Sequence, residues 1–239
     1  MAREITLAEF PVFLREKAEQ FFEVKRQALS VWDQLHSDYP NWRVPDDARL
    51  AFFGRMVNHC DAIGFLLLAA ADCLGDPDWW SRRVRVGTAN DITIFLEETE
   101  RTGRRYGFLN GWGQIEAQLR RMISAHQGGG GADNIYPACD KFYREGIKHP
   151  RASEIMNLIN LATKTRNAAV HNDFTYYPRG KSPVTVVQYR GSSYRFEAGK
   201  QIDFFTWDFI HSILLDFLAI YEETVRHSAV SDMPFISSR

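Results

Sequence analysis

Hydrophobic residues recur every three or four positions along most of the N-terminal half of the chain. This spacing places them on one face of an α-helix. The pattern predicts a helix over about 10–35, which polar residues and a proline then end, and a second over about 46–74, with Gly75 as its stop. A third helix is expected over about 90–103.

The C-terminal half begins with the same helical spacing and then changes. Apolar residues at intervals of three and four predict a helix over 104–126 and another over 153–170. An apolar run over 183–189, a Gly-containing turn and a second short apolar run predict a β-hairpin. Thr206 then opens a strongly apolar final helix.

These elements predict an all-α fold, a helical bundle with one inserted β-hairpin and additional N-terminal helices. We expect an N-terminal helical region over 1–103, a bundle over 104–228 with the hairpin at about 184–204, and a tail over 229–239. Four successive glycines at 128–131 predict a flexible linker, because glycine loses the most conformational freedom on ordering.

Charge is divided unevenly along the 239 residues. The net charge is −1, but residues 1–100 carry −6 and residues 101–239 carry +5. A basic half is compatible with a polyanionic partner, although a small surplus of Arg and Lys is also typical of an ordinary solvated surface.

The compartment is also indicated by the sequence. The longest uncharged apolar run, 62–71, is shorter than the roughly 20 residues that span a bilayer, so no membrane contact is predicted. The three cysteines contain no C-x-x-C pair, which favours a reducing cytoplasm.

One short stretch carries the candidate chemistry. Arg166, Asn167 and His171 bring a guanidinium, a carboxamide and an imidazole into about one and a half helical turns. An imidazole can take a proton from a ribose 2′-OH near neutral pH, and a guanidinium can bind the phosphate oxygens on which negative charge builds. Asn167 and His171 share a helix face, whereas Arg166 and His171 lie roughly 140° apart around the axis.

A single Arg and a single His are few groups for phosphoryl transfer, which usually needs separate acid and base groups. Two copies related by a two-fold axis would double the set and form a groove for the strand. The sequence therefore predicts a homodimer, RNA as the substrate, and cleavage to a 2′,3′-cyclic phosphate. No cofactor and no metal are predicted, because the His and Cys residues lack the short spacing of a zinc site.

At these residues the chain resembles the HEPN superfamily, whose signature is R-N-x-x-x-H, here Arg166, Asn167 and His171 followed by Asn172. The stretch 108–120 is similar to the family's core helix, whose acidic and basic residues face the motif. The resemblance covers about 104–228. It implies a four-helix core, dimerisation and metal-independent endoribonuclease activity in toxin–antitoxin or phage-defence systems, with an antitoxin or regulatory protein as partner.

The resemblance makes Arg166 and His171 catalytic and Asn167 supporting. Further substrate-binding candidates come from the core helix, from the residue after the motif and from the basic, aromatic segment that follows it. They are Glu116, Arg120, Asn172, Tyr176, Tyr177, Arg179 and Lys181. Stacking on RNA bases is the role expected of the two tyrosines.

Three other interpretations of the Arg166–His171 motif are compatible with the sequence. His171 can cap the last carbonyls of its helix while Arg166 pairs with an acidic residue, which is a purely structural role. The same fold can bind a nucleotide or a protein partner without cleaving RNA. The chain can also be an enzyme that is latent until a partner or ligand reshapes the interface.

Overall fold

The structure is a computed structural model. It describes residues 6–43, 46–76, 78–79, 82, 89–128, 134–171, 174–178 and 182–237, with the side chains of residues 89, 90 and 171 excluded. The chain is mostly helical and carries one two-stranded sheet, so the predicted all-α class with an inserted hairpin is confirmed.

The elements follow one another in a simple order. They are α1 (Phe10–Asp38), α2 (Ala48–Gly75), α4 (Ala89–His126), α5 (Ile135–Lys141) with a π-helical turn (Phe142–Gly146), α6 (Ala152–His171), β1 (Val184–Tyr189), β2 (Ser192–Glu197), α7 (Trp207–Arg226) and α8 (Ser228–Ser231).

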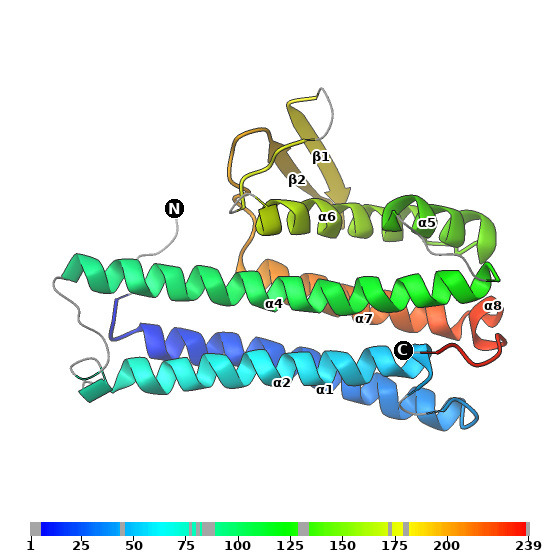
Figure 1. Cartoon of the computed structure of the whole chain (residues 1–239), viewed down its shortest axis with the longest axis horizontal. Coiled ribbons are helices and arrows are strands. Elements are labelled where there is room, and N and C mark those ends of the chain that lie inside the picture. Colours follow the sequence, from blue (N-terminus) through cyan, green and yellow to red (C-terminus); the bar gives the residue numbers. More distant parts are fainter. Residues whose placement is uncertain are drawn as a thin grey trace.

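The long helices lie in three layers (Figure 1). The pair α1 and α2 forms one layer, α4 and α7 form the middle layer, and α5, α6 and the hairpin lie on the other side. The N-terminal helices α1 and α2 therefore lie on the opposite side of the middle layer from α6. Apolar residues from all three layers form one continuous core.

Two helix starts lie where the sequence predicts them, and the hairpin lies within its predicted range of about 184–204 but ends at Glu197. Asp47 accepts a hydrogen bond from the Arg49 backbone N–H, and Thr206 accepts one from Phe209, so both act as N-caps. The antiparallel strands pair from Val184 opposite Glu197 to Tyr189 opposite Ser192. Between them Arg190 and Gly191 both have positive φ, 47° and 75°, as a two-residue hairpin turn requires.

One prediction about the middle of the chain is wrong. A single helix, α4, replaces the two helices expected over 90–103 and 104–126. The domain boundary predicted between residues 103 and 104 therefore falls inside a helix. Residues 1–103 and 104–228 share a core rather than forming separate units.

Glycines explain this difference. Gly103, Gly107 and Gly111 lie four residues apart and so share one face of α4. A Cβ atom at Gly107 would lie 2.8 Å from the ring of Phe21, and one at Gly111 would lie 2.8 Å from Leu214. These glycines let neighbouring side chains pack directly on the helix backbone, so they are packing positions and not helix ends.

The structure describes only the first glycine of the predicted linker, Gly128. Gly128 has a φ of 75°, and the rest of the predicted linker at 129–131 lies outside the described residues.

Within the described ranges, α2 is long and apolar enough to cross a membrane by length and composition, a test that core helices also pass. Here α2 packs against α1 and α4.

Candidate functional site

The candidate motif lies at the C-terminal end of α6. Arg166 and Asn167 are half-buried in its last turns, and the helix ends at His171. Ala168 and Ala169 are buried, so this side of the helix is held against the core. The polar pair therefore stands at the edge of the packed interior, where solvent reaches it.

The side chains of Arg166 and Asn167 are joined. A guanidinium N–H of Arg166 donates to the Asn167 carboxamide oxygen over 3.2 Å. Because successive helical residues lie about 100° apart, this bond draws the guanidinium around the axis towards the Asn167 side. That is also the face of position 171, four residues on. The His171 side chain lies outside the described residues, so only its backbone position at the helix end is given.

Backbone hydrogen bonds hold the chain that leaves the motif. Phe174, with a φ of 65°, donates its N–H to the carbonyl of Ala168 over 3.0 Å. The Tyr176 N–H donates to Lys200, and the Ile202 N–H donates to Phe174. The segment after the hairpin thus anchors the segment after the motif. Asn172, a predicted substrate-binding residue, lies outside the described residues.

Arg105 is a residue that the sequence analysis missed. It extends from α4, and a guanidinium N–H donates to the carbonyl of Val170 over 3.3 Å. A cation at a helix C-terminus is favourable, because the unpaired carbonyls there carry partial negative charge. The distance of 65 residues along the chain leaves no sequence signal for this contact.

The predicted stacking residues separate into two environments. Tyr176 is only 6% exposed, and its ring packs against Phe196 under the hairpin. The Lys164 ammonium lies over the same ring, 5.6 Å from its centroid. Tyr177 is 61% exposed. Of the two tyrosines, only Tyr177 is therefore available to stack on a base.

The remaining predicted residues do not join this cluster within one copy. Glu116 and Arg120 pair with each other over 2.7 Å. They lie about 16 and 22 Å along α4 from Arg105, by the helical rise per residue. The expectation that they face the motif is therefore not met in a single chain. Arg179 and Lys181 lie outside the described residues.

The cations near the end of α6 have neutral hydrogen-bond partners. Among the described residues, Arg105 donates to a backbone carbonyl, Arg166 to a carboxamide and Lys164 to the Tyr176 hydroxyl. Three positive charges near one helix end thus have no carboxylate partner in the described part of the chain. Such charges attract an anion from solution.

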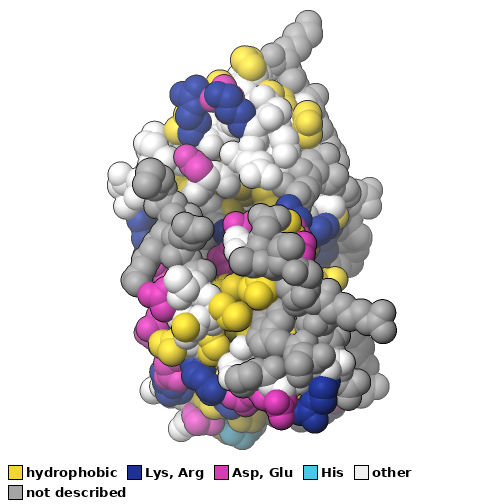
Figure 2. Space-filling view, turned by 90° about the vertical axis from the view of Figure 1, so that its left-hand side faces the viewer, with side chains coloured by type: hydrophobic (Ala, Val, Ile, Leu, Met, Phe, Trp, Pro, Cys, Tyr) yellow, Lys and Arg dark blue, Asp and Glu magenta, His cyan; other side chains and the backbone are white. Residues whose placement is uncertain are grey.

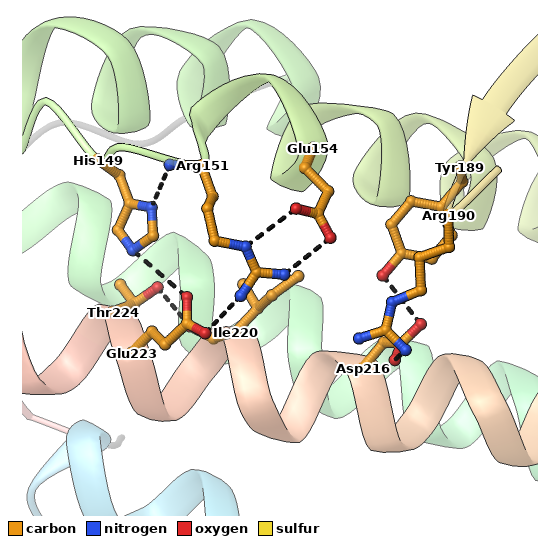
Figure 3. A network of polar contacts seen from close by, with 9 residues as sticks. All are labelled: His149, Arg151, Glu154, Tyr189, Arg190, Asp216, Ile220, Glu223 and Thr224. Atoms are coloured by element: carbon orange, nitrogen blue, oxygen red, sulfur yellow. Dashed lines mark hydrogen bonds and ion pairs between the residues drawn. The ribbon is translucent and has the colours of Figure 1, made fainter.

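The other end of α6 is different (Figure 3). Arg151 pairs with Glu154 and, over 2.5 Å, with Glu223 of α7. The hydrogen bond from Arg151 lowers the pKa of Glu154 below its usual range. At this end each arginine drawn in the figure is matched by a carboxylate.

A neighbouring group of polar contacts joins the hairpin turn to Asp216 of α7. This carboxylate is 4% exposed, accepts a hydrogen bond from the Tyr189 hydroxyl over 2.9 Å and pairs with Arg190. Burial raises the pKa of Asp216, and the Tyr189 hydrogen bond and the Arg190 charge act in the opposite direction. The cluster fastens the hairpin to α7.

Other reactive groups lie away from the motif. Burial raises the pKa of the Cys60 and Cys139 thiols to about 12, so both are protonated near neutral pH. Among the described residues, no three His, Cys, Asp or Glu side chains are grouped so that they could hold a metal ion.

Comparison with known proteins adds no relative to these observations. No family model, no curated protein and no solved structure matches the chain.

Proposed function

We propose that this protein is a metal-independent endoribonuclease of the HEPN type, with its site at the C-terminal end of α6. The observation that carries the proposal is the set of three cations there, Arg105, Lys164 and Arg166, whose described partners are all neutral. An RNA phosphate would be a negatively charged partner for these three side chains.

The motif residues have distinct roles in the proposed reaction. His171 accepts the proton of a ribose 2′-OH, whose oxygen then bonds to the adjacent phosphorus. The bond from phosphorus to the 5′-oxygen breaks, and that oxygen takes up a proton. The products are a 2′,3′-cyclic phosphate and a free 5′-OH. Arg166 donates hydrogen bonds to the phosphate oxygens, and Asn167 orients the guanidinium through the bond between their side chains.

Arg105 is a positioning residue in this scheme. Its hydrogen bond to the Val170 carbonyl fixes the backbone one residue before His171. Tyr177 is exposed and is proposed to stack on a neighbouring base.

Two copies complete the proposed site. A homodimer that brings two α6 ends together supplies a second imidazole as the general acid. A toxin or defence role in the cytoplasm, with an antitoxin or regulatory protein as partner, follows from the resemblance of the Arg166–His171 motif and is part of the same proposal.

Incubation of the purified protein with total RNA in EDTA tests the activity. We expect fragments ending in 2′,3′-cyclic phosphate from the wild type and none from His171→Ala. His36→Ala is the matched control, because His36 is an exposed histidine of α1. Cutting that survives in His171→Ala, or that requires added metal, would refute the proposal.

A non-catalytic module is the second candidate, because cations with neutral partners can also bind a nucleotide without cleaving it. Absence of cutting, together with a rise in melting temperature on adding a nucleotide, would favour this function. Light scattering at micromolar concentration tests the dimer separately, and a monomer would remove the two-copy mechanism.

A further inference from the structure

A cleft of about 930 Å³ lies on the far side of α4 from α6. It is bordered by the first turns of α1, by the N-terminal part of α4 and by the start of α7. Arg104 lines this cleft, whereas the next residue, Arg105, reaches the end of α6. The cleft is therefore separate from the proposed ribonuclease site.

The floor of the cleft is apolar and aromatic. Phe10, Leu96 and Trp207 line it and are almost fully buried, and Phe13 lies beside them. Figure 2 looks onto this end of the molecule, where apolar side chains gather in the lower middle and acidic side chains lie at their margin. An apolar group bound on this floor would leave water.

The charged residues of the lining are mostly acidic, with five carboxylates and two cations. Both cations have partners within the cleft, since Lys17 pairs with Asp208 and Arg104 pairs with Glu100. Glu16 of α1 and Glu97 of α4 also line the cleft, and neither has a cationic partner among the described residues. Among the described residues, the cleft thus offers two unmatched carboxylates, one from α1 and one from α4.

We propose that this cleft binds a basic peptide segment of a partner protein, one that carries an apolar side chain between Lys or Arg residues. The apolar side chain lies on the aromatic floor, and the cations pair with Glu16 and Glu97. The shape favours a peptide over a small amine, because the lining extends from Thr93 to Arg104, about 16 Å along α4. That length fits about five extended residues.

Fluorescence anisotropy with a dye-labelled peptide Lys-Leu-Trp-Lys-Leu-Lys tests the proposal. We expect saturable binding, with no binding of the matched peptide Glu-Leu-Trp-Glu-Leu-Glu. The double variant Glu16→Gln/Glu97→Gln should weaken binding about five-fold, as two partly exposed ion pairs would.

The control variant is Glu19→Gln/Glu98→Gln, which removes the same charge from the same two helices. Glu19 and Glu98 pair with Arg26 and Arg101 and are not part of the lining. Binding should be unchanged in this control. Equal weakening in both double variants, or no saturable binding of the basic peptide, would overturn the proposal. Tryptamine binding as tightly as the peptide would assign the cleft to small amines and would also overturn it.

Discussion

Both ends of α6 carry arginine, but the two ends differ in what those arginines contact. At the N-terminal end, Arg151 pairs with Glu154 and Glu223, and the hairpin residue Arg190 pairs with the buried Asp216 (Figure 3). At the C-terminal end, the described partners of Arg105 and Arg166 are neutral oxygens.

Under the proposed function, this difference separates a structural role from a binding role. An arginine matched by carboxylates contributes to joining helices and has little remaining attraction for an anion. An arginine that donates only to neutral oxygens keeps its charge available to a phosphate, which accepts paired hydrogen bonds from a guanidinium. The composition of α6 alone does not reveal which of its two ends belongs to which class.

The largest expected effect compares arginines at the two ends. Under the proposed function, Arg166→Gln should slow RNA cleavage roughly 100- to 1,000-fold, because the positive charge and the paired guanidinium donors to the transition state are lost. Arg151→Gln should leave the rate within about two-fold, because Arg151 is at the other end of the helix and is already paired. Single-turnover rates on a fluorogenic RNA measure both. Equal losses in the two variants would break the comparison.

The next effect tests the packing of α2 on α4, where His59 of α2 hydrogen-bonds to the Gly107 carbonyl of α4. Burial lowers the pKa of His59 from 6.5 to about 4. The unfolded chain therefore binds a proton between these values that the folded chain does not. The contribution of His59 to the free energy of unfolding should be fully present above pH 6.5. It should fall by about 3 kcal/mol as the pH drops to 4, with no further loss from this group below that pH.

Urea unfolding at several pH values measures this loss. His59→Gln keeps a neutral donor for the Gly107 carbonyl and should remove the His59 contribution to the slope between pH 6.5 and 4. An unchanged slope in His59→Gln would assign the pH dependence to other groups.

Removal of a matched charge at the N-terminal end of α6 should have a smaller effect on the free energy of unfolding. Asp216→Ala leaves the buried Tyr189 hydroxyl without its acceptor and should destabilise the fold by about 1–3 kcal/mol. Asp216→Asn keeps an acceptor and should cost less. Denaturant unfolding measures stability, and the cleavage rate of the folded variants should not change. A large loss of cleavage in folded Asp216→Ala would show that contacts at the N-terminal end of α6 affect the proposed site at its C-terminal end, against this comparison.

The smallest effect gives a stability control that leaves the charges at both ends unaltered. Gly113 of α4 is exposed, and a Cβ there would meet no described atom within 4 Å. Gly113→Ala should stabilise the protein by about 1 kcal/mol through helix propensity. Gly107→Ala, which would push against Phe21, should destabilise it by about 1–3 kcal/mol. Melting temperatures that move the same way in both variants would contradict the packing role of the glycine face.

Much of the secondary structure could be predicted, because helix caps and hydrophobic spacing are local signals. The helices that begin after Asp47 and Thr206 start where the sequence indicated, and the hairpin over 184–197 lies within its predicted range of about 184–204. The division of α4 at Gly103 was wrong, because a glycine under a neighbouring side chain resembles a helix stop in sequence. Only the facing side chain distinguishes the two cases.

The sequence by itself determined the helical class, the hairpin and the motif Arg166-Asn167-x-x-x-His171, since each depends on residues close together in the chain. The tertiary structure decided which charges are matched. It brought Arg105 to the end of α6, buried the ring of Tyr176 and paired Arg120 with Glu116 on α4. These outcomes depend on distances between segments far apart in sequence, which no local pattern encodes.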